Sequence, residues 1–504
     1  MFRAIIILLF IIFAFQEFCF GTPLLETENL NLFLYSYLRK DLVAFNNVTD
    51  LDSNNDDDTT IYLGIDYSLA FDLQFKENNS KFYLKLERNG PFDYNLPLFV
   101  HNTLMTSGGV IEKYHNDELL PQLEEFWFDI PLLNTFRFKG GLYSYEVGYG
   151  FSLNGGYENY GFSIYRQSED STWRFYYCSP EIVYKNHLGP RIRQDEEQGV
   201  LYNPGAYNFF ASDIKLQKEK YSLNPYVGIL TDYTSCGKRD NLFSAPIEKE
   251  ILGTAGIFWE LENEPFSFKS EFAHNFGKAE SSDASYNDIT HTGYLFYAGV
   301  EYSLNKFTPS AQFLIGSGNK VSEDAALNQE ATLASSKNRA FSSYSPLNLN
   351  LGDSISPAHS DIRPIVAMGS GNGLNYGIPR PGSLAASDFD NIIILSLGIN
   401  YNLTENLSLG LFGYYLRSPE KAAGMLNGSP KYLSQELGNE LDLLIDFTVN
   451  ENILISFLGG YFSPGQYYKE ERDDVDSSLL SPYLRGDGGA DCAYHIELAA
   501  EFQF

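Results

Sequence analysis

Cysteine is scarce in this chain, and the few cysteines form no motif. Only 4 of the 504 residues are cysteine, and Cys178, Cys236 and Cys492 lie far apart in the sequence. One disulfide among these three would suit an oxidising compartment. The wide spacing excludes a disulfide framework and the closely paired cysteines of a zinc site. We therefore expect neither a bound metal nor a cofactor.

Basic residues are also few relative to acidic ones. The chain holds 35 Lys and Arg against 65 Asp and Glu, which gives a formal net charge of −30. Binding to nucleic-acid phosphates requires a positive surface, so a nucleic-acid partner is excluded. Most of the charge is explained by a hydrophilic, well-solvated outer surface.

Long apolar runs are missing except at the start of the chain. Ala4–Phe15 is an unbroken apolar run after Arg3, and the small residues Cys19 and Gly21 follow it. This pattern predicts a signal peptide over residues 1–21, so we expect an exported protein. No later run is long enough to cross a membrane as a helix.

Motifs for catalysis are lacking as well. The 7 histidines are scattered without metal-ligand spacing, and the sequence has neither a nucleophile elbow nor a phosphate-binding loop. Gly369–Gly373 (GSGNG) has glycines but lacks the strand-to-helix setting that a phosphate loop needs. We therefore predict no catalytic residues and expect that the chain is not an enzyme.

What the sequence does contain is repeated period-two alternation with many aromatic residues. It holds 36 Tyr, 39 Phe and 42 Gly. In Ile61–Phe75 every odd position is apolar, and even positions include Asp66, Ser68, Asp72 and Gln74. Fifteen alternating residues suit a strand that crosses a bilayer at a tilt better than a strand of a soluble sandwich.

Similar segments recur along the whole chain, which predicts an all-β fold. We expect a single antiparallel transmembrane β-barrel of 16 to 18 strands, with 18 favoured, because an even number closes such a barrel. The other predicted strands are Lys81–Glu87, Glu125–Ile130, Thr135–Tyr145, Tyr160–Arg166, Thr172–Tyr177, Tyr207–Leu216, Ala255–Glu262, Phe266–Phe276, Tyr294–Leu304, Ile392–Leu403, Leu407–Leu416, Glu440–Val449, Ile453–Tyr461 and Tyr494–Phe504.

Short and long connections alternate between these strands. Asn402–Asn406 and Val449–Asn452 are short turns, whereas Arg417–Gly438 is a long polar stretch. We expect short periplasmic turns and long extracellular loops. The longest insert, 316–390, is rich in small and polar residues, so it either folds inward as a constriction or cap or is simply mobile.

The domain organisation follows from these features. Residues 1–21 form the predicted signal peptide, 22–57 an acidic N-terminal segment, and 58–504 the barrel with its long loop 316–390. The final strand alternates up to Phe504, as in the strand that the barrel-assembly machinery recognises. We expect localisation in the outer membrane of a Gram-negative-type bacterium, contact with lipid, and a monomer.

Parity assigns the lumen side of each strand, because apolar side chains must face lipid. The acidic residues expected to line the pore are Asp66, Asp72, Glu125, Asp129, Glu260, Glu262, Glu271, Glu301, Glu440, Asp442, Asp446, Glu497 and Glu501. The basic ones are Lys81, Lys85, Arg137, Lys139, Arg174 and Lys269. This acidic excess predicts a preference for cations or neutral solutes. The alternative is a wall of paired charges, with Arg137 and Lys139 bound to Glu125 and Asp129.

Two stretches resemble the alginate-export family of outer-membrane barrels. Leu437–Gly465 is similar to the family's terminal strand pair, with a Gly-x-Glu-Leu-Asp strand, a tight turn and a Gly-Tyr-Phe-x-Pro-Gly ending. Phe313–Asn319 (FLIGSGN) and Phe341–Leu347 (FSSYSPL) are similar to its loop and to the segment beyond. The resemblance implies an 18-stranded monomeric barrel with a loop or plug at the pore. It also implies transport of a sugar polymer or of small solutes.

The predicted function is therefore an outer-membrane channel of the alginate-export type for cationic or neutral solutes or a neutral polysaccharide. The acidic lumen does not match an exporter of an anionic polymer, which should carry a basic selectivity region, although that export remains an alternative. A second alternative is a surface-exposed structural or adhesive barrel with a plugged lumen, because the insert 316–390 is long enough to fill it.

Overall fold

Strands form nearly all of the regular structure. The computed structural model describes residues 23–46, 51, 60–88, 105–106, 109–110, 122–133, 135–143, 145–154, 160–178, 207–233, 247–284, 287–319, 337–341, 362, 364–368, 389–421, 423–427, 429–471 and 489–503. The predicted signal peptide 1–21, Phe504 and Cys236 lie outside the described residues.

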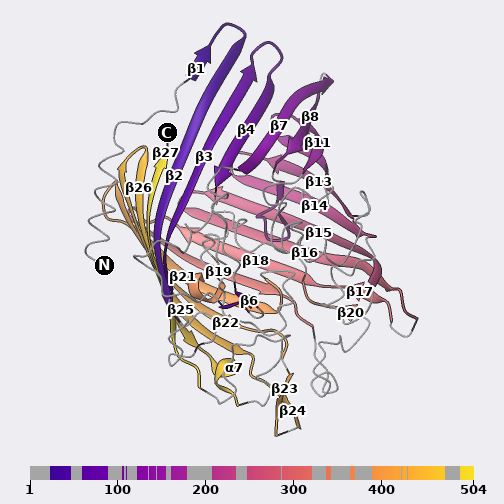
Figure 1. Ribbon diagram of the computed structural model, residues 1–504, viewed down its shortest axis with the longest axis vertical. Helices are drawn as coiled ribbons and strands as arrows, with labels where there is room; N and C mark the ends of the chain where they lie inside the picture. Colours follow the sequence, from indigo (N-terminus) through magenta and orange to yellow (C-terminus); the bar gives the residue numbers. More distant parts are fainter. Residues whose placement is uncertain are drawn as a thin grey trace.

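Eighteen antiparallel strands pair with their neighbours along the chain and close into a barrel (Figure 1). They are β2 (Leu30–Asn46), β3 (Thr60–Phe75), β4 (Ser80–Arg88), β7 (Gln122–Leu133), β8 (Phe136–Leu142), β11 (Tyr160–Gln167), β12 (Ser171–Cys178), β13 (Tyr207–Gln217), β14 (Tyr221–Asp232), β15 (Ile247–Asn263), β16 (Phe266–Ser281), β18 (Tyr294–Tyr302), β19 (Phe307–Gly316), β21 (Ile392–Asn402), β22 (Leu407–Arg417), β25 (Glu436–Asn450), β26 (Ile453–Pro464) and β27 (Ala493–Gln503). Closure joins β2 to β27, with Tyr37 opposite Gln503 and Asn46 opposite Tyr494. The predicted fold class is confirmed.

The remaining elements are short. β1 (Pro23–Glu26) extends the sheet beside β2, and β17 (Ile289–His291) joins β16 to β20 (Lys337–Asn338). Separate hairpins are β5 (Met105–Thr106) with β6 (Gly109–Val110), β9 (Glu146–Val147) with β10 (Leu153–Asn154), and β23 (Ala423–Leu426) with β24 (Ser429–Tyr432). The helices are α6 (Ile365–Met368) and α7 (Gln466–Lys469). No helix in the described ranges has the length and apolar character that crossing a membrane requires.

Connection lengths alternate strictly around the barrel. Turns of two to four residues, such as 264–265, 403–406 and 451–452, join one end of the strands. Long connections, such as 317–391 between β19 and β21, lie at the other end. Chain neighbours therefore pair as hairpins on the short-turn side, as expected of an outer-membrane barrel.

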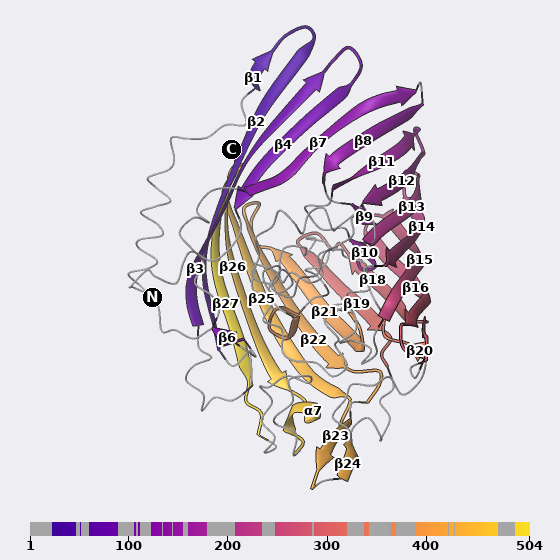
Figure 2. The ribbon, with the colours of Figure 1, turned by 45° about the vertical axis from the view of Figure 1, so that its right-hand side comes forward.

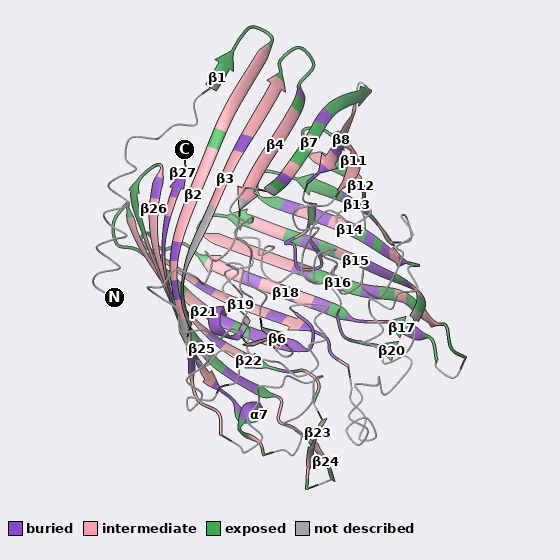
Figure 3. Cartoon of the chain, viewed as in Figure 1, coloured by how far each residue is buried: buried purple, intermediate pink, exposed green. Residues whose placement is uncertain are grey.

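The two faces of the wall differ in polarity, as the alternation predicts. On β16, Phe272 and Phe276 point outward and are 45% and 39% exposed, whereas Glu271 and Asn275 point inward and are buried. In Figure 3 strands β13 to β16 alternate between buried and more exposed residues along their length. A bilayer requires an apolar outer surface of this kind.

Three of the strands were not predicted, and each has a physical reason. β14 and β19 contain Pro225 and Pro309, and proline weakens a strand assignment because it lacks a ladder N–H. Both strands also carry apolar residues on their inward face, which blurs the alternation. Phe313–Gly316, assigned to a loop in the family comparison, is the end of β19.

The barrel begins earlier than predicted. β2 lies within the segment 22–57, which the sequence analysis separates from the barrel. It pairs with β3 on one side and β27 on the other, so without it the barrel could not close. The acidic residues near 50–58 follow this strand in the sequence. They make the segment 22–57 as a whole look acidic, and this average hides the strand.

Candidate functional site

The connection between β8 and β11 folds into the barrel. Figure 2 shows β9 and β10 of this connection beside the wall formed by β13 to β16. Within residues 145–154, which we call the first inward segment, Tyr145, Tyr149, Phe151 and Leu153 are all buried. A connection that buries four large side chains within the barrel narrows the space inside it.

Glu271 on β16 anchors this first inward segment. Its carboxylate is fully buried and accepts hydrogen bonds from the Tyr149 amide at 2.6 Å and the Ser152 hydroxyl at 2.8 Å. The Tyr226 hydroxyl on β14 donates to the same carboxylate at 2.6 Å. A buried carboxylate needs such donors, so wall and segment satisfy one another.

Glycine is required where the segment passes this anchor. Gly148 has φ +67°, and a Cβ there would lie 3.0 Å from the Glu271 carboxylate. Its amide donates to Asn224 Oδ1 on β14 at 2.9 Å. The left-handed backbone and the close approach together exclude larger residues.

A second anchor joins the segment to β12 and β13. The Tyr145 hydroxyl donates to Asp213 Oδ1 at 2.9 Å, and its ring stacks on Tyr176 with centroids 4.1 Å apart. Arg174 lies over the Tyr145 ring at 4.3 Å and donates to Asp213 at 2.9 Å and to the Glu146 carbonyl at 2.9 Å. Burial raises the pKa of Tyr145 well above its usual value, so the hydroxyl remains a donor.

Aromatic packing joins the segment to the long insert. The Tyr149 ring stacks on Phe258 and Tyr297, with centroids 5.7 and 5.2 Å away. Phe151 contacts Tyr297 at 4.9 Å and Phe389, near the end of the insert, at 5.0 Å. The first inward segment and the end of the insert therefore contact each other.

The start of insert 316–390 is tied to residues 339–341 of the same insert. Asn319 Oδ1 accepts the amides of Arg339 at 2.6 Å and Ala340 at 3.2 Å. The Phe341 amide donates to the Ser317 carbonyl at 2.9 Å, and Phe341 is fully buried. Phe341 belongs to the main cluster of buried apolar residues, so this part of the insert packs against the rest of the molecule.

A further part of the insert, residues 364–368, docks on the opposite wall. We call it the second inward segment; it contains α6, with Ile365, Val366 and Ala367 buried. The Val366 and Ala367 amides donate to Glu440 at 2.6 and 2.8 Å, and the Ile365 amide donates to Asp442 at 3.1 Å. The insert was expected either to fold inward or to be mobile, and residues 364–368 fold inward.

Gly460 on β26 provides the space for this docking. A Cβ at Gly460 would lie 2.8 Å from Val366 Cγ2 and 3.0 Å from Asp442 Oδ1. Asp442 and Gly460 are register partners on adjacent strands. The missing side chain therefore forms a notch beside the two carboxylates.

Three predicted pore-lining acids have a different role from the one expected. Glu271, Glu440 and Asp442 point inward, but they are at most 4% exposed because the inward segments cover them. Parity places them on the same side of the wall as the inward segments that they contact. It does not reveal that segments distant in the sequence bind to them.

Most of the other predicted acids have neighbouring donors on the wall. Asp72 accepts from Gln74 at 2.6 Å, Glu125 from Trp127 at 3.0 Å, Asp129 from Arg137 at 2.9 Å, Asp446 from Ser456 at 2.7 Å, and Glu497 and Glu501 from Arg39 at 2.6 and 2.8 Å. Glu301 is half-buried on β18, and Glu262 is exposed beside a turn. The backbone of Asp66 lies opposite Arg39, and its side chain is outside the described part.

Five of the six predicted basic residues are compensated by acids or aromatic rings. Arg137 pairs with Asp129, Arg174 with Asp213, Lys85 with Glu87, and Lys269 with Glu260 at 3.7 Å. Lys139 lies over the Trp127 ring at 3.9 Å and the Tyr143 ring at 4.3 Å. Lys81 is exposed near a turn. The pairing of Arg137 agrees with the alternative of a charge-paired wall.

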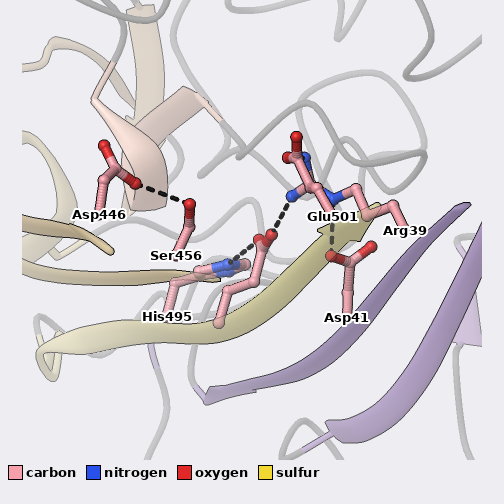
Figure 4. Close-up of polar contacts among 7 residues, drawn as sticks. Arg39, Asp41, Asp446, Ser456, His495 and Glu501 are labelled. Atoms are coloured by element: carbon pink, nitrogen blue, oxygen red, sulfur yellow. Dashed lines mark hydrogen bonds and ion pairs between the residues drawn. The ribbon is translucent and has the colours of Figure 1, made fainter. Parts of the chain in front are cut away.

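Sequence reasoning missed Arg39, which organises the seam between β2 and β27. It binds Asp41 at 2.7 Å, Glu497 at 2.6 Å and Glu501 at 2.8 Å (Figure 4). His495 lies 3.4 Å from Glu497 in the same cluster. Assigning β2 to an N-terminal segment hid this cation, and Asp213 was also overlooked on a correctly predicted strand.

Within the described residues, no cluster of three or more His, Cys, Asp and Glu side chains could hold a metal ion. The inward side chains instead bind one another and the two inward segments. The site is therefore a narrowed, charged barrel interior.

Comparison with known proteins relates this fold to outer-membrane barrels. No family model matches the chain, and no curated protein matches it. Among solved structures, OccK9 (OpdG) of Pseudomonas aeruginosa is similar with a TM-score of 0.51 at 8% identity, over 94% of this chain and 98% of that one. OpdQ of P. aeruginosa gives 0.49 at 9% identity, over 94% and 97%. OccAB4 of Acinetobacter baumannii gives 0.48 at 10% identity, over 96% and 100%. At such identity the likeness to OccK9 shows a shared fold alone.

Proposed function

We propose that this chain is an outer-membrane channel that passes small cationic or neutral solutes through a lumen narrowed by the two inward segments. A closed barrel with an apolar outer face suits a bilayer, and inward-folded connections suit a selective constriction. The fold shared with OccK9 supports a channel of this type. The signal peptide and outer-membrane localisation remain part of the proposal.

We infer the class of solute from the charges on the inward face of the wall. Each ion-paired inward basic residue is matched by at least one carboxylate, and Arg39 alone has three. Asp446 and Glu125 have only neutral hydrogen-bond donors. The field inside the barrel is therefore expected to repel anions and admit cations.

Reversal potentials in planar bilayers under a KCl gradient test this proposal. We expect cation selectivity in the purified chain. Arg39→Gln should increase it, because Glu497 and Glu501 lose their cation, and the matched Glu501→Gln should decrease it. Anion selectivity, or shifts of the opposite sign in these variants, would refute the solute class, and no conductance at all would refute the channel.

The alternative of a structural or adhesive barrel with a plugged lumen is supported by one observation. The inward segments contribute many of the buried apolar residues inside the barrel, including Phe151, Val366 and Ala367. The same bilayer recording distinguishes it, since the full-length chain with a plugged lumen conducts nothing.

A link to alginate export gains no support from the comparisons. A polysaccharide exporter, whether of a neutral or an anionic polymer, needs a wide path through the lumen. The two inward segments make such a path narrow, and Arg39, Arg137 and Arg174, which an anionic chain could otherwise bind, are already paired with carboxylates. We therefore favour small solutes.

A further inference from the structure

Glu440 and Asp442 form a carboxylate pair with a distinctive set of partners. Both point inward from β25, and three of their four oxygens accept main-chain amides of the second inward segment, at 2.6 to 3.1 Å. The fourth, Asp442 Oδ1, is buried and has no hydrogen-bond partner. Among the described residues, no Lys, Arg or His forms an ion pair with either carboxylate.

Such a pair is incompletely satisfied by its present partners. Two adjacent buried carboxylates repel each other, and neutral amides do not compensate their charge. A donor that is itself a cation makes stronger hydrogen bonds to a carboxylate and removes the repulsion. The orphaned Asp442 Oδ1 would give such a donor a fourth acceptor.

The segment now docked there buries three apolar side chains, and its described hydrogen bonds to the wall all come from the backbone. Ile365, Val366 and Ala367 have no polar side chains, and their hydrogen bonds to the wall come from backbone amides. The notch at Gly460 accommodates Val366, so docking of the segment in this position requires a glycine there. An alternative ligand with several N–H groups could therefore replace these amides at the same oxygens.

We propose that Glu440 and Asp442 form a binding site for a solute bearing an N–H cation, an alkylammonium or a guanidinium, and that the amides of residues 365–367 occupy this site until the solute arrives. The inference rests on the proposed function, since it names the class of cationic solute that the channel would bind. A guanidinium offers five N–H donors in a plane and can serve both carboxylates at once. A quaternary ammonium ion has no N–H and cannot replace the amides.

Cross-linking measures whether the segment leaves the site. The Cβ of Ile365 lies 3.3 Å from a Cβ built on Gly460, close to the separation of about 3.8 Å in a disulfide. In the full-length barrel with its native cysteines replaced, and with Val366→Ala removing the methyl group that a side chain at position 460 would meet, Ile365→Cys/Gly460→Cys should therefore oxidise readily. We expect methylguanidinium to slow this oxidation several-fold and tetramethylammonium at the same concentration to leave it unchanged.

Direct binding provides the second measurement, which needs no introduced cysteines. Calorimetry with methylguanidinium should give saturable heat with the native barrel and with Asp446→Asn, which removes a carboxylate from the same face of β25. The heat should be lost in Glu440→Gln/Asp442→Asn. Equal heat in that variant, or equal effects of methylguanidinium and tetramethylammonium on cross-linking, would overturn the proposal.

Neither measurement depends on ion flow. A barrel that binds methylguanidinium but conducts nothing would keep this site and refute the channel. A cation-selective channel without such binding would refute the site and keep the channel.

Discussion

The two inward segments differ in how the barrel holds them. The first, 145–154, is packed by four large side chains and anchored through both backbone and side-chain bonds to Glu271, Asn224 and Asp213. The second, 364–368, buries the smaller side chains of Ile365, Val366 and Ala367, and its described bonds to Glu440 and Asp442 come from backbone amides alone. From this difference we expect the first segment to be fixed, whereas the second is the one that we propose a solute can displace.

Removing the main anchor of the first segment should have the largest effect. Glu271→Ala leaves three buried donors, on Tyr149, Ser152 and Tyr226, without an acceptor. Because each unsatisfied group costs about 1 to 3 kcal/mol, we expect a loss of about 3 kcal/mol or more in the free energy of unfolding. Urea titration of the barrel in lipid vesicles measures it. Glu301→Ala is the control, and an equal loss there would contradict the assignment.

A methyl group at the passage past Glu271 should have the next largest effect. Gly148→Ala forces a left-handed backbone on alanine and brings its Cβ against the carboxylate, which we expect to cost about 1 to 3 kcal/mol. Gly413→Ala, whose Cβ would meet nothing closer than 3.9 Å, serves as the control in the same titration. Similar stability of the two variants would show that the first segment is not tightly fixed.

Loss of the single hydrogen bond between Tyr145 and Asp213 should lower the free energy of unfolding less than the two changes above. Tyr145→Phe removes the hydrogen bond to Asp213 and keeps the ring stacked on Tyr176, so we expect a destabilisation of about 1 kcal/mol. Tyr494→Phe on the exposed outer face should change the free energy of unfolding very little. If the two substitutions cost the same, the second anchor contributes nothing measurable.

The notch of the second segment should be the least costly to fill. Gly460→Ala places a methyl group 2.8 Å from Val366, so the segment must shift, while the wall around it is unchanged. We expect the free energy of unfolding to change by less than about 0.5 kcal/mol. Single-channel conductance should rise, whereas Gly459→Ala on the outer face should leave it unaltered. A large stability loss without a conductance change would remove the contrast between the segments.

Alternation predicted fifteen of the strands because lipid on one side and polar contacts on the other impose a period of two. It failed at β14 and β19, where prolines and inward-facing apolar residues weaken the pattern. β2 was missed for another reason, since the acidic residues that follow it placed it in a separate segment. Arg39 was lost with that strand, and with it the cation that compensates Glu497 and Glu501.

The sequence by itself determined the barrel class and the side of the wall on which Glu271, Glu440 and Asp442 lie, because strand parity is a local property. Only the tertiary structure decided that these carboxylates are covered rather than exposed to the lumen. Their partners are far away in the chain: Ser152 is 119 residues from Glu271, and Val366 is 74 residues from Glu440. Which long connection packs on which strands depends on how the closed barrel places distant strands. No local sequence pattern contains that information.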